Sequence, residues 1–113
     1  MRLEDRKFLY DIKQAADLLG EFTAEKQFAD YQENSMLRAA VERKFEIIGE
    51  ALSKLSKSDS AIASRISEHA RIIAFRNILI HGYAEIDDRL VWDILENKLP
   101  TLRHEVDELL AND

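Results

Sequence analysis

Apolar residues recur at every third or fourth position along most of this chain, which is the spacing of helices that bury one face. Over residues 3–19 this apolar stripe consists of Phe8, Ile12, Ala15 and Leu19. Gly20 follows directly, and glycine is a common residue just beyond the C-terminus of a helix. The pattern therefore predicts a first helix that ends at Gly20.

A second helix is predicted from about residue 30 to residue 55. Asp30 and Glu33 have the spacing of a capping box at its start. Its apolar stripe consists of Leu37, Val41, Ile48, Leu52 and Leu55. Residues 56–60 are polar and predict a loop or a short helical turn before the next element.

Residues 67–81 differ from the other segments because their apolar side chains surround the helix axis. These side chains are Ile72, Ile73, Phe75, Ile78, Leu79 and Ile80. A helix that is apolar on nearly all sides should be buried, either within this chain or against a second copy. Gly82 is the expected end of this helix.

The last apolar stripe, from residue 87 onward, is interrupted by Pro100. Asp87 is a suitable N-cap for its first part. Pro100 must kink the helix or start a new one, because proline has no N–H and clashes with the preceding turn. The segments together predict an all-α protein: an antiparallel bundle of four, and up to five, main helices, with residues 1–113 as a single domain.

The composition fits such a bundle and excludes several functions. Of 113 residues 46% are hydrophobic, and three glycines and one proline are too few for a turn-rich β fold. The absence of cysteine excludes disulfides, thiolate metal sites and cysteine nucleophiles. With no membrane-length apolar run and no signal peptide, we expect a cytoplasmic protein. The net charge of −6 argues against a broad surface for nucleic acid, so any such contact is local or shared with a partner.

Three polar residues, Arg76, Asn77 and His81, stand in the most apolar of the predicted helices. Because their desolvation is costly, they are either satisfied core groups, residues of a dimer seam, or a functional site. Asn77 and His81 share a helix face, whereas Arg76 lies about 140° around the axis from His81. To act on one atom, the arginine must wrap around, the helix must loosen near Gly82, or a second subunit must complete the site.

The pattern Arg76-x4-His81-x-Tyr83, with Asn77 after the arginine, resembles the R-x4-H-x-Y motif of HEPN-domain ribonucleases, and in particular of the HepT toxin family. The runs Glu42–Ala51 and Ile94–Leu102 resemble two further segments of that family, so the resemblance covers nearly the whole chain in order. It implies a HEPN-like helical bundle that forms a homodimer, with the motif near the subunit interface.

The resemblance also implies a function. HepT-like toxins are metal-independent endoribonucleases of type VII-like toxin–antitoxin pairs. Each is neutralised when a minimal nucleotidyltransferase antitoxin, called MntA, adenylylates the motif tyrosine, which here is Tyr83. An AMP group on Tyr83 would occupy the space and the donors that an RNA phosphate needs. The alternative for Tyr83 is a partly buried aromatic residue near a helix end.

The residue types of the motif suit RNA cleavage. RNA carries its own nucleophile, the 2′-OH, so cleavage needs proton transfer and stabilisation of a more negative phosphorus centre. Histidine exchanges protons near neutral pH and suits acid–base work at His81. Arg76 offers a planar fork of donors for phosphate oxygens, and Asn77 can hold the imidazole or bind phosphate. No metal or other cofactor is expected.

Two features of the second predicted helix bear on Arg76. Glu42, Glu46 and Glu50 repeat every four residues and share one helix face. They are either a solvated face paired with nearby basic residues, or one of them orients Arg76 across a helix interface. Gly49 lies mid-helix, where it costs about 1 kcal/mol relative to alanine. It therefore indicates close approach by another helix.

Other interpretations of the motif stay open at this point. The chain can be a non-catalytic subunit that binds a nucleotidyltransferase through Arg76 and His81, which the acidic net charge favours, or a plain helical dimerisation module. Some basic residues either form a rim near the motif or only balance nearby acids; they are Lys54, Lys57, Arg65 and Arg71.

Overall fold

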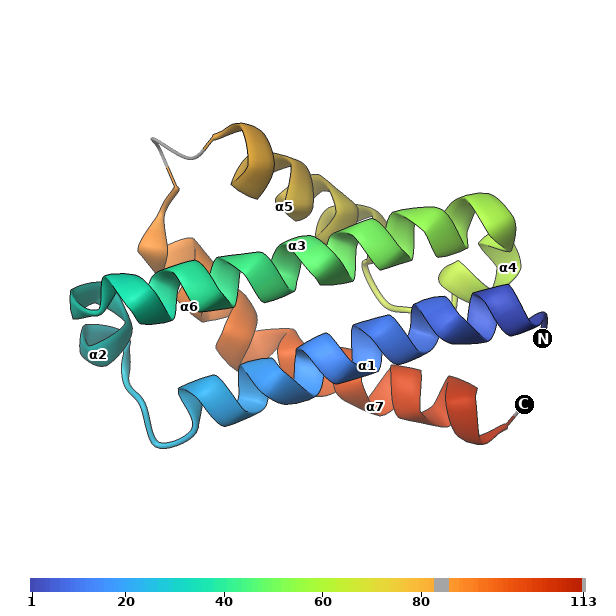
Figure 1. Ribbon diagram of the computed structural model, residues 1–113, viewed down its shortest axis with the longest axis horizontal. Coiled ribbons are helices and arrows are strands. Elements are labelled where there is room, and N and C mark those ends of the chain that lie inside the picture. The colour runs from blue at the N-terminus through green and yellow to red at the C-terminus, as the bar shows by residue number, and fades with distance from the viewer. Residues whose placement is uncertain (83–85, 113) are drawn as a thin grey trace.

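The computed structural model describes residues 1–82 and 86–112, and its helices are shown in Figure 1. Within these ranges the chain forms seven helices and no strand. Their bounds are α1 Leu3–Thr23, α2 Phe28–Glu33, α3 Ser35–Ser58, α4 Ser60–Ala63, α5 His69–His81, α6 Asp88–Asn97 and α7 Leu99–Ala111. Five of them have ten or more residues, so the prediction of an all-α bundle with up to five main helices is confirmed.

The two longest helices, α1 and α3, lie side by side and run in opposite directions (Figure 1). Helix α5 packs on α3, α7 packs on α1, and α6 contacts both α2 and α7. The core lies between these layers, and its fully buried side chains include Leu9, Ile12, Leu19, Val41, Ile48, Leu52, Leu55 and Val106. None of the helices in the described part of the chain is long and apolar enough to cross a membrane.

The prediction that Gly20 ends the first helix is wrong, because α1 continues to Thr23. The guanidinium of Arg103, from α7, lies against Gly20, and a Cβ at this position would come within 2.7 Å of it. Arg103 also pairs with Asp17 at 3.1 Å. Gly20 therefore makes room for a side chain of α7 and does not end α1.

The capping box predicted at Asp30 and Glu33 is also wrong. Asp30 caps the short helix α2, where its carboxylate accepts the backbone N–H of Gln27 at 2.8 Å. The long helix begins later, at Asn34, whose side-chain oxygen accepts the N–H of Leu37 at 3.0 Å. Asparagine is as good an N-cap as aspartate, so the sequence contains two possible starts for the long helix, Asp30 and Asn34, only four residues apart.

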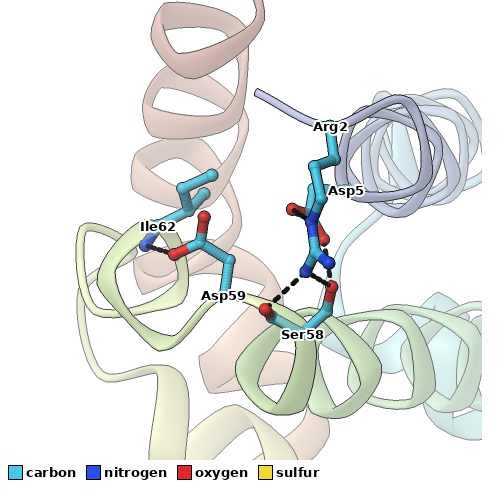
Figure 2. A network of polar contacts seen from close by, with 5 residues as sticks. All are labelled: Arg2, Asp5, Ser58, Asp59 and Ile62. Carbon is cyan, nitrogen blue, oxygen red and sulfur yellow. Dashed lines mark hydrogen bonds and ion pairs between the residues drawn. The ribbon is translucent and has the colours of Figure 1, made fainter.

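A buried carboxylate ties the beginning of α1 to the end of α3 (Figure 2). Asp5 is fully buried, accepts a hydrogen bond from the Ser58 hydroxyl at 2.6 Å and lies 3.3 Å from the Arg2 guanidinium. Arg2 in turn donates to the Ser58 carbonyl at 2.6 Å. The next residue, Asp59, caps the short helix α4 through the N–H of Ile62. A short helical turn follows the long helix as predicted, but α3 continues to Ser58, beyond its predicted end at Leu55.

The predicted boundaries of the later helices are confirmed. Helix α5 ends at His81 and is followed by Gly82, and the Asp87 carboxylate accepts the N–H of Arg89 at 2.9 Å at the start of α6. Pro100 lies in the first turn of α7, which is a separate helix from α6 because the two are divided at Lys98. Proline fits there because a first-turn N–H has no partner within the helix.

Helix α5 is not buried on all sides within this chain. Among its residues only Phe75 and Leu79 are buried, while Ile78 is 49% and Ile80 is 38% exposed. One alternative from the sequence, burial inside the same chain, is therefore wrong. The helix carries an apolar face that the other described residues leave exposed.

Candidate active site

The site begins with an unusually close approach of α3 and α5. A Cβ built on Gly49 of α3 would overlap the Cβ of Arg76 and lie 2.7 Å from its Cγ. Below this contact the rings of Phe45 and Phe75 meet edge to face, with centroids 5.3 Å apart. The close approach predicted from Gly49 is thus present, and it presses the stem of Arg76 against the backbone of α3.

Arg76 is held by one residue from each helix. Its Nη2 forms an ion pair with the Glu50 carboxylate, and its Nη1 donates to the Asn77 side-chain oxygen at 3.0 Å. Its Nε is buried and has no hydrogen-bond partner among the described residues. The side chain is 26% exposed, so part of the guanidinium is open to solvent while its orientation is fixed from two sides.

His81 lies at the last position of α5 and is exposed. The helix remains regular up to this point, because the N–H of Gly82 donates to the carbonyl of Ile78 at 2.7 Å. Arg76 turns toward Glu50 and does not wrap around the helix toward His81. Within one chain, Arg76 and His81 could reach the same atom only if the arginine wrapped around the helix or the helix loosened near Gly82. This structure shows neither.

Among the three glutamates of α3, Glu50 is the one that contacts Arg76. It also pairs with Lys54 at 3.6 Å. Glu46 pairs with Arg43 at 3.7 Å and lines the same groove as Glu50. These two ion pairs, to Lys54 and to Arg43, agree with the expectation that the glutamates pair with nearby basic residues.

Glu42 has a different environment from the other two glutamates. Burial raises the pKa of its carboxyl group, and the negative charges of Asp88 and Glu46 add to this effect. Burial also raises the pKa of Tyr31, and the negative charges of Glu42 and Asp88 raise it further. Glu42 therefore belongs to the contact between α2, α3 and α6 and not to the surroundings of Arg76.

A polar groove of about 390 Å³ opens beside Arg76. Its walls come from α1, α3 and α5, and its charged lining residues are Lys7, Asp11, Arg43, Glu46, Glu50, Lys54 and Arg76. Of the predicted basic rim only Lys54 lines it; Arg71 pairs with Glu68 on another face. Sequence reasoning did not place Lys7 or Arg43 beside Arg76, because an exposed base three or four residues from an acid is typical of any solvated helix face.

An apolar groove of similar size lies on the other side of α5. Its apolar lining comes from α3, α5, α6 and α7 and includes Phe45, Ile72, Phe75, Ile78, Leu90, Ile94 and Leu102. Tyr83 lies outside the described residues, so its role stays a prediction. Within the described ranges, no group of three His, Asp or Glu side chains is arranged to hold a metal ion.

These features define a class: an all-helical domain that presents an arginine, an asparagine and a histidine from one helix, with the arginine fixed by the neighbouring helix. The chain matches the family model HepT-like, described as ribonuclease HepT-like, over residues 12–109. It therefore belongs to the HepT-like ribonuclease family.

Several curated proteins are similar to this chain over most of its length. "Putative RNase MJ1380" of Methanocaldococcus jannaschii is 37% identical over 102 residues, which are 90% of this chain and 93% of that protein. "Probable ribonuclease HepT" of Thermococcus cleftensis is 32% identical over 111 residues, 96% of this chain and 98% of that protein. "Putative RNase TTE0752" of Caldanaerobacter subterraneus is 31% identical and covers 96% of both chains. No solved structure matches the chain.

Proposed function

We propose that this protein is a HepT-type toxin of the cytoplasm, a homodimeric endoribonuclease that cleaves RNA without a metal ion. The observation that carries the proposal is the fixed guanidinium of Arg76, held by Glu50 and Asn77 with one part open to solvent. A group of donors that is already oriented stabilises a developing negative charge without having to reorganise. Membership of a ribonuclease family gives RNA as the substrate class.

In the proposed reaction the RNA 2′-oxygen attacks the adjacent phosphorus. The proton of the 2′-OH passes to the His81 imidazole, and the bond from phosphorus to the 5′-oxygen breaks. The leaving 5′-oxygen takes a proton from an imidazolium, so the products are a 2′,3′-cyclic phosphate and a 5′-hydroxyl end. Arg76 stabilises the extra negative charge on the phosphate oxygens, and loss of such a donor costs roughly 10²–10³ in rate.

The homodimer is supported by the surface of α5. Ala70, Ala74, Asn77 and His81 are exposed and share one side of this helix, with Ile78 and Ile80 flanking them. Two small residues one turn apart allow a second helix to approach closely, and the flanking isoleucines supply apolar area to bury. In such a dimer the two His81 side chains lie at the interface, and the proposed reaction requires each of them to reach Arg76 of the other subunit.

The partner in this proposal is an MntA-like minimal nucleotidyltransferase that adenylylates Tyr83. Tyr83 follows His81 by two positions in the sequence, so the residue proposed to be modified belongs to the same short motif as the proposed catalytic base. The added AMP carries a negative phosphodiester, which competes with RNA phosphate for the donors of Arg76. Modification thereby blocks the active site without a permanent complex.

The proposal is tested by incubating purified, unmodified protein with total RNA in EDTA, beside a His81→Ala variant. We expect cleavage that persists in EDTA and is absent from the variant. The 5′-hydroxyl ends of the products, read by labelling with and without prior phosphatase treatment, check the proposed chemistry.

A folded protein whose Tyr83 is unmodified by mass spectrometry, and which leaves RNA intact, would overturn the ribonuclease proposal. That result favours the non-catalytic subunit of a nucleotidyltransferase. Cleavage that continues in the His81→Ala variant would place the chemistry elsewhere.

A further inference from the structure

The polar groove beside Arg76 is continuous with the proposed active site. Arg76 and Ile80 of α5 form one wall, and the remaining walls belong to α1 and α3. Because Arg76 lines the groove and also serves the scissile phosphate in the proposed reaction, a strand bound at Arg76 has the groove as its next available surface.

Apart from Arg76, the bases of the groove form long, exposed ion pairs in the described part of the chain. Lys7 lies 3.6 Å from Asp11, Arg43 lies 3.7 Å from Glu46, and Lys54 lies 3.6 Å from Glu50. Each pair joins residues three or four positions apart on the same helix, and all three bases are exposed. Exposed pairs of this kind contribute little to stability, so a phosphate can replace the carboxylate at little cost to the fold.

The groove has a local charge opposite to that of the whole chain. Four bases line it against three carboxylates, whereas the chain carries a net charge of −6. A polyanion is repelled by most of this surface and finds compensation in the groove. The acidic net charge of the chain implied that any contact with nucleic acid must be local, and this groove is such a local surface.

The groove also has an aromatic residue among its bases. Phe8 of α1 lines it and is only partly buried. A basic channel with an aromatic side chain is the usual combination for single-stranded nucleic acid, because an unpaired base stacks on the ring while phosphates pair with lysine and arginine. A base-paired duplex does not offer its bases for such stacking.

We propose that this groove binds the single-stranded RNA segment next to the cleavage point, with Lys7 and Lys54 pairing with its phosphates and Phe8 accepting a base. The inference rests on the proposed ribonuclease function, and it adds a substrate class, unpaired RNA, and a binding surface outside the motif.

The test uses a His81→Ala background, so that the probe stays intact, and a fluorescently labelled single-stranded RNA oligonucleotide titrated at several salt concentrations. We expect the added pair of changes Lys7→Gln and Lys54→Gln to weaken binding at least tenfold. It should also lower the slope of log affinity against log salt by about 1.4, since each phosphate contact with a single strand contributes about 0.7. Lys7→Gln and Lys54→Gln are also measured singly, and each is compared with Lys57→Gln, which removes one charge from α3 outside the groove.

Equal affinity of the double variant and the Lys57→Gln control would overturn the inference, as would tighter binding of the same sequence in a duplex. Absence of RNA binding by the background protein would overturn it as well. Cleavage assays with His81 intact separate this result from the proposed function. A protein that cleaves RNA without depending on Lys7 and Lys54 refutes only the groove, and one that binds RNA through them without cleaving refutes only the ribonuclease.

Discussion

The absence of a side chain at Gly49 decides where Arg76 can lie. The stem of Arg76 occupies the space that a Cβ at Gly49 would fill, and the carbonyl of Ile72 is 3.5 Å from the same point. The Ile72 carbonyl is at an ordinary van der Waals distance, so the obstacle is the Arg76 stem. Its Cβ is attached directly to the backbone of α5 and cannot move away unless the helix moves. Gly49 weakens α3 locally, but the contact between Arg76 and Glu50 depends on it.

Replacing this glycine should separate the two helices. We expect Gly49→Ala to lower the free energy of unfolding by about 2 kcal/mol, because overpacking costs up to about 3 kcal/mol and the gain in helix propensity returns about 1. Urea denaturation gives this value. Gly20→Ala is the matched control: there the obstacle is the flexible end of Arg103, which can move away, and stability should be unchanged or higher by up to about 1 kcal/mol. Equal effects of the two substitutions would contradict the argument.

Glu50 acts as a positioning residue for Arg76 in the proposed mechanism. We expect Glu50→Gln to lower kcat for RNA cleavage by roughly 10- to 100-fold, because a displacement of about 1 Å can cost 10²-fold, while KM changes little. Glu46→Gln serves as the control, since Glu46 lines the same groove and forms its ion pair with Arg43. A rise in KM without a change in kcat would assign Glu50 to substrate binding and refute its positioning role.

The environment of Glu42 makes a prediction about pH. Its pKa is raised in the folded protein above the usual 4.5, so the neutral form favours folding. Its contribution is complete below pH 4.5 and is lost as the pH rises through the higher folded value. We therefore expect Glu42→Gln to be more stable than the natural protein at pH 7, with the gain shrinking toward pH 4. Thermal melts across this range measure it, and a gain independent of pH would rule out this cause.

At the scale of elements, α5 combines the site with the uncovered surface of the molecule. Its buried side rests on α3 through Phe75 and Leu79, and the opposite side presents Ala70, Ala74 and His81. A regular helix cannot turn Arg76 and His81 toward one point, and this one is regular to its end. In the proposed mechanism, this geometry is the reason why a second copy would be needed to complete the site, and it indicates which face that copy would use.

A charge in the middle of this face should prevent dimerisation without affecting the fold of the subunit. We expect Ala74→Glu to be monomeric by analytical ultracentrifugation at concentrations where the natural protein is dimeric, with an unchanged helical circular dichroism spectrum. Ala39→Glu, on an exposed position of α3, is the control and should remain dimeric. A dimer that survives Ala74→Glu would show that the subunits meet through another surface.

At the scale of the whole molecule, the proposed site belongs to two subunits. If Arg76 of one subunit works with His81 of the other, a mixed dimer of Arg76→Ala and His81→Ala subunits contains one complete site. Random mixing makes half of the dimers mixed, so activity should return to about a quarter of the natural level.

The experiment is made by refolding the two inactive variants together and measuring RNA cleavage. Each variant refolded alone is the control. No recovery in a sample shown by mass to contain mixed dimers would mean that each subunit uses its own Arg76 and His81.

The sequence by itself determined the helical class, the later helix boundaries and the residues of the motif, because these depend on local spacing and on the chemistry of single side chains. It placed Gly49 inside a helix and wrongly predicted that Gly20 ends one, since a glycine that ends a helix and one that admits a neighbouring arginine have the same local signal. Only the tertiary structure decided that Glu50, and not Glu42, meets Arg76, and that Lys7 and Arg43 share a groove with it. These pairings join helices that are far apart in the sequence, and they follow from how closely the helices pack at Gly49.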